Sequence, residues 1–368
     1  MSMHKRLRAG NAGTALRGTA LGTSLLALTA CGTGAEAGQE ESGAELESSS
    51  SCTAEDSALR VYTNDWGETM TDRFTEDTGI DTEVADLGGG ELLARIAAEA
   101  NNPQWDVVVL DGHGSIEGLD QQGQLLSGHT LENVENLTSQ AAELMPGDNA
   151  WVPISEHAAA VIAYNTETIS AEDAPQSWEE LTDADYAPVG IADPAAAAPA
   201  YPAVSWFFQD LGQEGAEEYF GRLIDNGFNT YDRNGPVAQA VASGEVPVAM
   251  LQEHNVYGLL DDGEPVDFVW PEEGAPGAVR AAAISAETPS PCTSQKFVDW
   301  LLEVETMDYL MAQGGDDSIV TPYIEGTDTS YLPEQRPEDP EILITEAEFA
   351  ADSEAEIKDW FSNQMAGR

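Results

Sequence analysis

The feature that most constrains the fold is a regular alternation of short apolar runs with amphipathic segments. In the first part of the chain, Leu59–Tyr62, Ile80–Val84 and Asp106–Leu110 have the composition of strands, and Glu68–Thr78 and Leu92–Ala100 have the pattern of helices. Strands that alternate with helices predict a parallel sheet. Ligands bind at the carboxyl ends of such strands, so the loops that follow them are the first candidates for a site.

The same alternation resumes after residue 158. Val161–Tyr164, Val189–Ala192 and Val246–Leu251 are predicted strands, and Tyr201–Leu211 and Gly235–Ser243 are predicted helices. Two α/β halves are the simplest account of this pattern.

The charge of the chain excludes one large class of partners. It has 67 Asp and Glu against 14 Lys and Arg, a formal net charge of -53. A field this negative repels phosphate backbones, so no nucleic-acid partner is expected. The acidic segment Glu334–Glu356 is expected to be a solvated wrap over the surface.

The N-terminus has the pattern of a bacterial lipoprotein signal. Residues 1–30 combine basic residues with an apolar stretch too short to span a bilayer, and Leu28-Thr29-Ala30-Cys31 matches the lipobox. We expect lipidation of Cys31, a flexible tether over residues 31–57, and a protein anchored through lipid on the extracellular face of the cell membrane. The alternative is an ordinary cleaved signal with a chance cysteine.

Two cysteines remain if Cys31 carries lipid. Cys52 and Cys292 allow a single pairing, and an oxidising compartment lets a disulfide persist. The alternative is two free thiols. Two cysteines are too few for a zinc-finger spacing.

In combination, the motifs resemble the extracellular solute-binding proteins of ABC importers, in the branch that contains ferric-ion, polyamine, thiamine and phosphonate binders. The similarity covers roughly residues 58–325. The segments that carry it are Leu59–Thr63, Phe74–Ile80, Gly89–Ile96, Asn102–Asp111, Ala163–Asn165, Ala174–Leu181, Asp193–Pro194 and Val237–Val246.

The resemblance implies two Rossmann-like lobes joined by two hinge crossovers, a periplasmic binding protein-like II fold that closes on its ligand. Lobe 1 would be residues 58–155 with 272–368, lobe 2 residues 156–271, and the crossovers would lie near 153–160 and 278–286. Cys52 and Cys292 would then share lobe 1. The implied partners are a small-molecule solute and a membrane permease that recognises the closed form, with no cofactor, for a monomer that is not an enzyme.

Carried over position by position, the resemblance also suggests ligand contacts. Gly90 and Gly235 begin helices and offer backbone N–H groups to an anion. The face of Trp66 and the carboxylates of Asp65, Glu91, Asp111, Glu156 and Glu253 suit a cation such as a polyamine or thiamine, which is slightly favoured here. An acidic chain, however, also carries loop carboxylates by chance. The candidate ligand-binding residues are Thr63, Asn64, Asp65, Trp66, Gly90, Glu91, Asp111, Glu156, Tyr201, Arg233, Asn234 and Glu253.

Other solutes stay open as alternatives. The case for a phosphonate or sugar phosphate is weakened, because Ala195–Pro199 stands where anion binders of the family carry hydroxyl side chains. The case for ferric iron is weakened, because the single Tyr257 stands where ferric binders of the family carry two adjacent tyrosines. A divalent-metal site would have to use His113, His157 and His254, whose spacing is not diagnostic. A lipid-anchored hydrolase is the rival class, but neither a nucleophile elbow nor a Walker A sequence is present.

Overall fold

The computed structural model describes residues 49, 52–55 and 57–366. The predicted signal peptide, Cys31 and most of the tether lie outside the described residues. Within the described residues, no helix has the length and apolar character needed to cross a membrane. Residues 57–366 all belong to one compact unit.

The first of two sheets has the strand order β11-β4-β10-β3-β1-β2, with β12 paired to β10. Its strands are β1 (Leu59–Thr63), β2 (Thr82–Asp86), β3 (Val107–Asp111), β4 (Trp151–Ala158), β10 (Ala275–Ile284), β11 (Thr321–Pro322) and β12 (Ile342–Leu343). β1 is parallel to β2 and β3, as the alternating pattern predicts. All five residues of β3 are buried, which suits its β-branched sequence for the middle of a covered sheet.

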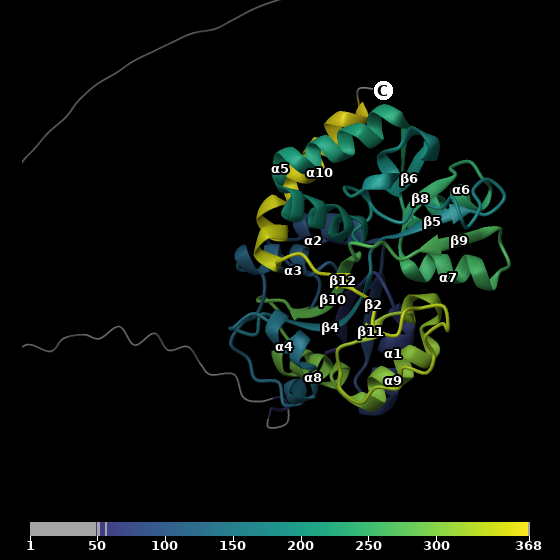
Figure 1. Cartoon of the computed structure of the whole chain (residues 1–368). Helices are drawn as coiled ribbons and strands as arrows, with labels where there is room; N and C mark the ends of the chain where they lie inside the picture. The colour runs from purple at the N-terminus through teal and green to yellow at the C-terminus, as the bar shows by residue number, and fades with distance from the viewer. Residues whose placement is uncertain (1–48, 50–51, 56, 367–368) are drawn as a thin grey trace, which may run out of the picture. The chain divides into compact units, whose positions relative to one another are not determined.

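Helices cover this sheet and connect its strands (Figure 1). They are α1 (Gly67–Thr78), α2 (Gly89–Ala98), α3 (His113–Gln121), α4 (Ser139–Leu144), α8 (Pro291–Leu301) and α9 (Val304–Gln313). α1 ends at Gly79, whose φ of 73° is left-handed and whose N–H bonds the Thr75 carbonyl. Glycine takes this conformation at little cost, so the sequence fixes the end of the helix.

The second sheet has the order β7-β6-β8-β5-β9. Its elements are β5 (Val161–Asn165), β6 (Val189–Ala192), α5 (Ala200–Gly227), β7 (Phe228–Tyr231), α6 (Asn234–Ala242), β8 (Val248–Leu251), α7 (Glu253–Asp261) and β9 (Val266–Val269). α5 is interrupted at Gly212, where φ is 70° and ψ is 168°. The interruption separates the two helical segments within α5.

Two neighbouring strands of the first sheet lead to the second. β4 and β10 pair antiparallel, β5 begins shortly after β4, and β10 begins shortly after β9. The expected crossovers near 153–160 and 278–286 fall on these two strands. The predicted α/β architecture with two lobes is confirmed, and we call the parts built on the two sheets the first lobe and the second lobe.

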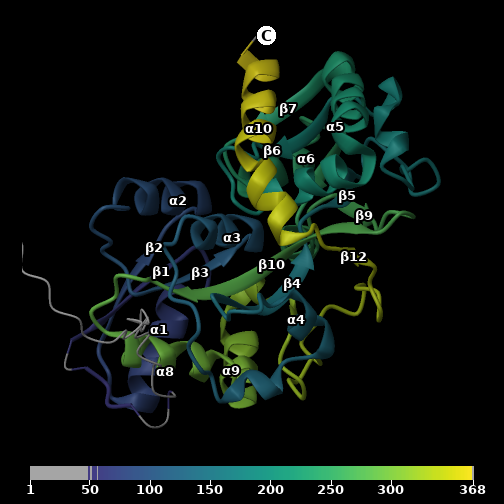
Figure 2. The same cartoon turned by 90° about the vertical axis from the view of Figure 1, so that its left-hand side faces the viewer.

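The C-terminal segment is not the solvated wrap that its acidity predicts. Arg336 is only 8% exposed and bonds Glu253, and β12 joins the first sheet. α10 (Ala347–Ala366) then runs along α3 and α5, so it contacts both lobes (Figure 2). The prediction was wrong because Arg336, Thr345 and Ala350 stand between the acids of this segment and are buried.

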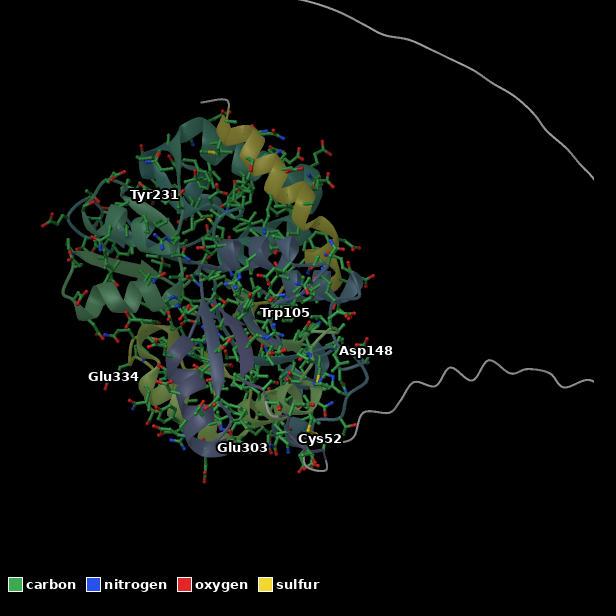
Figure 3. All side chains as sticks on the ribbon, turned by 180° about the vertical axis from the view of Figure 1, so that it is seen from behind. Cys52, Trp105, Asp148, Tyr231, Glu303 and Glu334 are labelled. Carbon is green, nitrogen blue, oxygen red and sulfur yellow. A yellow bond between two sulfur atoms is a disulfide. The ribbon has the colours of Figure 1, made fainter. Side chains whose placement is uncertain are left out.

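The structure pairs Cys52 with Cys292, with the Cα atoms 5.9 Å apart. Cys52 lies on the first lobe, far from Tyr231 of the second sheet (Figure 3). The Glu55 carboxylate accepts the backbone N–H groups of Cys292 at 3.2 Å and Thr293 at 2.9 Å, at the start of α8. The beginning of the described chain is therefore fastened to α8.

Candidate functional site

A cavity of about 480 Å³ lies between the two lobes. Both lobes and the 3-10 turn at residues 315–318 contribute to its wall. The lining residues are Asn64, Asp65, Gly88, Gly89, Glu91, Ala196, Ala197, Ala198, Pro199, Asp232, Arg233, Asn234, Gln252, His254, Asn255 and Asp317.

The cavity forms at the carboxyl ends of parallel strands. Asn64 and Asp65 follow β1 in the first lobe, while Asp232 and Gln252 follow β7 and β8 in the second. Parallel strands end at the same edge of their sheet, so residues far apart in the sequence meet there. This is the position that the alternating pattern predicts.

Four helices begin at this cavity. Their N-cap residues, Gly88 of α2, Pro199 of α5, Arg233 of α6 and Gln252 of α7, all line the wall. None of these four caps its helix with a side-chain hydrogen bond. The first N–H groups of α2, α6 and α7 have no partner within their helix and carry partial positive charge, so this wall is suited to an anionic group. The start of α5 adds no free N–H group, because those of Ala200 and Tyr201 bond the Ala197 and Ala198 carbonyls and the next residue is Pro202.

A buried arginine neutralises the carboxylates behind the first-lobe wall. Arg280 of β10 donates from Nε to Asp111 at 2.9 Å and from Nη2 to Asp65 at 2.9 Å. Its guanidinium also lies 4.0 Å from the ring centre of Trp66. Burial and the charge of Asp111 raise the pKa of Asp65. Burial also works against ionisation of Asp111, but Arg280 and His157 outweigh it and lower the pKa of Asp111.

A chain of polar side chains connects this arginine cluster to the second lobe. His157 Nε2 of β4 lies 4.0 Å from Asp111 and 3.0 Å from Gln252 Nε2. Gln252 in turn accepts a hydrogen bond from Asn234. Two residues at the cavity wall are thereby held through His157 on the strand that joins the lobes.

His157 makes stability depend on pH. Burial lowers its pKa to about 3 despite the attraction of Asp111, and His254, Arg280 and Arg336 lower it further. An unfolded histidine titrates near pH 6.5, so the unfolded state binds more protons below that pH and stability falls as pH decreases toward 3. For this one residue the loss is about 2 kcal/mol at pH 5.

We therefore expect His157→Gln to lose about 2 kcal/mol less stability than the wild type between pH 7 and pH 5. Urea unfolding at both pH values measures this difference, and any cost of the substitution that is independent of pH cancels. Equal losses in the two proteins would show that His157 does not titrate in this way.

The structure brings five of the predicted contacts to the cavity: Asn64, Asp65, Glu91, Arg233 and Asn234. The other seven do not line it. Thr63, Trp66 and Asp111 lie beneath the first-lobe wall, and Gly90 lies against Ala196. Two lining carboxylates, Asp232 and Asp317, were not predicted, although Asp232 stands directly after a predictable strand end.

Glu156, Glu253 and Tyr201 have structural partners instead. Glu253 is fully buried and accepts Arg336 Nε at 2.7 Å and the N–H of Ala158 at 2.8 Å. Glu156 accepts the Tyr323 hydroxyl at 2.7 Å, and Tyr201 donates to the Ala350 carbonyl at 2.5 Å. These contacts leave the three side chains without a role at the cavity.

The three histidines do not assemble a metal site. Among residues 49, 52–55 and 57–366, no group of three or more His, Cys, Asp or Glu side chains is arranged to hold a metal ion. His157 and His254 have ring centres 5.5 Å apart, whereas His113 bonds the Thr345 carbonyl. The Tyr257 hydroxyl is buried and does not line the cavity.

Comparison with known proteins places the chain among transport proteins. The family model for bacterial extracellular solute-binding proteins matches residues 69–342. An uncharacterized protein of Haemophilus influenzae is 27% identical over 72% of this chain and 78% of its own. A putative 2-aminoethylphosphonate-binding periplasmic protein of Salmonella typhi is 25% identical over 66% of this chain and 70% of its own.

Solved structures show the same fold. The periplasmic binding protein AfuA of Actinobacillus pleuropneumoniae, with fructose-6-phosphate bound, has a TM-score of 0.74 and 22% identity over 84% of this chain and 98% of that one. Iron-bound HitA of Pseudomonas aeruginosa has a TM-score of 0.71 and 23% identity over 83% and 99%. At these identities the likeness concerns the fold alone.

Proposed function

The chain belongs to the bacterial extracellular solute-binding protein family, and we propose that it captures a small phosphonate or phosphate ester for an ABC importer. The observation that carries the solute class is the meeting of three helix N-termini, those of α2, α6 and α7, without side-chain caps, at one cavity. Backbone N–H groups there take the place of the hydroxyl side chains that the sequence lacks at Ala195–Pro199.

The charges on the cavity wall fit a solute that also carries an amino group. Arg233 is the one arginine or lysine among the described residues that line it, whereas Glu91, Asp232 and Asp317 contribute carboxylates. An aminophosphonate places both signs in one small molecule. The name of the similar Salmonella typhi protein, a putative 2-aminoethylphosphonate-binding periplasmic protein, supports the same class.

A purely cationic solute is less well supported than the sequence suggests. Of the carboxylates expected to hold it, Asp65 and Asp111 pair with Arg280, and Glu253 pairs with Arg336. The expected cation–π face of Trp66 is also occupied, because Arg280 lies against it. At these three carboxylates, a polyamine or thiamine would have to displace the internal partners.

The proposal retains three further predictions. The closed form would deliver the solute to a membrane permease, the protein would act as a monomer without catalysis, and a lipid on Cys31 would hold it at the extracellular face of the membrane. The family supports delivery to an importer. Cys31 lies outside the described residues. Mass spectrometry of the membrane-extracted protein tests directly whether Cys31 carries a lipid.

Thermal unfolding of the purified protein against a solute panel tests the proposal. The panel is 2-aminoethylphosphonate, fructose-6-phosphate, inorganic phosphate, spermidine, thiamine, Fe(III) citrate and Zn(II). A solute present at about 100 times its Kd adds about 2.7 kcal/mol and raises the unfolding midpoint by about 4 °C. We expect this from a phosphonate or phosphate ester.

An arginine variant shows whether such binding uses the cavity. Arg233→Ala is expected to weaken binding about tenfold or more, because a hydrogen bond to a charged group contributes about 1.5–3 kcal/mol. Arg222→Ala is the matched control, since Arg222 pairs with Glu179 away from the cavity. A shift by spermidine or thiamine alone would contradict the proposed solute class.

A further inference from the structure

The two lobes touch where the start of α2 meets the loop before α5. A Cβ atom built on Gly89 would lie 2.1 Å from the Ala198 Cβ, and one built on Gly90 would lie 2.3 Å from the Ala196 carbonyl oxygen. Both distances are far shorter than the contacts that real Cβ atoms make with non-bonded neighbours. The lobes therefore approach each other here at a distance that only glycine permits.

This contact separates the cavity from the first-lobe core. Gly89, Ala196, Ala197 and Ala198 all line the cavity. Ala198 comes from the second lobe but is only 5% exposed, because it packs in a cluster with first-lobe residues such as Leu92. An alanine of one lobe is thus buried in the other.

The glycines are not required by the backbone. Gly88, Gly89 and Gly90 do not belong to the positions with positive φ, and Gly88 has φ of -58° and ψ of 140°. Gly89 and Gly90 are the first residues of α2, and alanine is the better helix former by up to about 1 kcal/mol. Close approach to Ala196 and Ala198 is the feature of the structure that disfavours a side chain there.

We propose that Gly89 and Gly90 form, with Ala196–Ala198, the contact by which the cleft closes on its solute. The absence of side chains at Gly89 and Gly90, the first two residues of α2, sets how far the lobes close and so limits the size of the solute. This inference rests on the proposed binding function.

The space beside the contact also holds a buried histidine without a complete set of partners. His254 lines the same cavity, is only 7% exposed, and its Nδ1 has no hydrogen-bond partner among the described residues. A buried polar group without a partner is costly unless something else satisfies it. The side chain stands at the start of α7, on the wall of the cavity.

The test compares Gly89→Ala and Gly90→Ala with Gly221→Ala. Gly221 is the matched control, because it also lies in a helix, α5, does not line the cavity, and a Cβ there would meet nothing within 4 Å. With 2-aminoethylphosphonate as the probe in calorimetry, we expect the Gly89 and Gly90 variants to bind at least tenfold more weakly and the Gly221 variant to bind within twofold of the wild type. Unfolding midpoints without the probe are expected to change by no more than about 2 °C, since the gain of a helix former offsets the lost contact of Ala198.

A rescue variant separates steric closure from a general defect. The obstruction in Gly89→Ala is the Ala198 Cβ, so Ala198→Gly in the same chain is expected to restore binding to within threefold of the wild type. Gly90→Ala meets a backbone oxygen instead, and Ala198→Gly is expected to leave it impaired. Failure of this rescue at Gly89, or wild-type affinity in both single variants, would overturn the inference.

Hydrogen exchange tests the contact between α2 and residues 196–198 in the absence of solute. We expect amides of residues 195–198 to exchange at least threefold faster in Gly90→Ala than in Gly221→Ala. If 2-aminoethylphosphonate binds neither the wild type nor any variant, the proposed solute class is contradicted. The exchange rates then test the contact between the lobes on their own. Equal exchange in the two variants would then overturn it.

Discussion

Replacing Arg280 with methionine is expected to lower the free energy of unfolding by about 3–5 kcal/mol, because removing one partner leaves buried carboxylates uncompensated. Arg280 is 1% exposed, and it donates to Asp65, to Asp111 and, at 3.2 Å, to the Asp317 carbonyl. Methionine keeps a long apolar side chain against Trp66, so the charge is the main loss. The unfolding midpoint should fall by roughly 5–8 °C.

The matched control is Arg222→Met. Arg222 also pairs with a carboxylate, Glu179, but its side chain is 42% exposed, so the expected loss stays within about 1 kcal/mol. Adding Asp65→Asn and Asp111→Asn to the Arg280 variant should recover part of its loss, since the uncompensated charges are then removed. A loss no larger than that of the control would mean that the buried cluster is not needed for stability.

Removing the Cys52–Cys292 disulfide is the second large effect that we expect. The bond closes a loop with a sequence separation of 240, for which the chain-entropy model gives roughly 5 kcal/mol, and removal of native disulfides typically costs about 2–5 kcal/mol. The double variant Cys52→Ser with Cys292→Ser should show this loss in urea unfolding. Both positions are changed together so that no single thiol is left to react.

A reducing agent provides the control. It should lower the unfolding midpoint of the wild type toward that of the double variant and leave the double variant unchanged. A midpoint of the wild type that does not respond to complete reduction, verified by thiol titration, would contradict the stabilising role. Glu55, which bonds the same end of α8, would then be the contact that fastens the start of the described chain.

The strands and their order along the chain could be predicted because their signals are local. The run Val107–Leu110 is β-branched and apolar over its length, and the structure makes it a central buried strand. Gly79 ends α1 where a left-handed residue is needed. From strands that alternate with helices, the position of the cleft at the strand ends follows, so Asn64 and Asp65 were found, whereas Arg233 came from the family resemblance.

The roles of the carboxylates could not be predicted in this way. Glu253 follows a strand just as Gln252 does, yet Gln252 lines the cavity and Glu253 is turned inward to Arg336. No feature of the sequence near Glu253 indicates that this carboxylate pairs with an arginine 83 residues away. In an acidic chain, many carboxylates stand in loops, and only the few arginines decide which of them are neutralised.

The sequence by itself determined the two α/β halves, the edge of each sheet where the site forms, and the resemblance to solute-binding proteins. Only the tertiary structure decided which side chains face the cavity, that four helix starts share it, and that Gly89 meets Ala198 across it. Strand and helix signals depend on neighbours within a few residues, whereas these contacts depend on how β3, β4 and β10 align. That alignment is fixed by the packing of the whole core, which no short segment of the chain encodes.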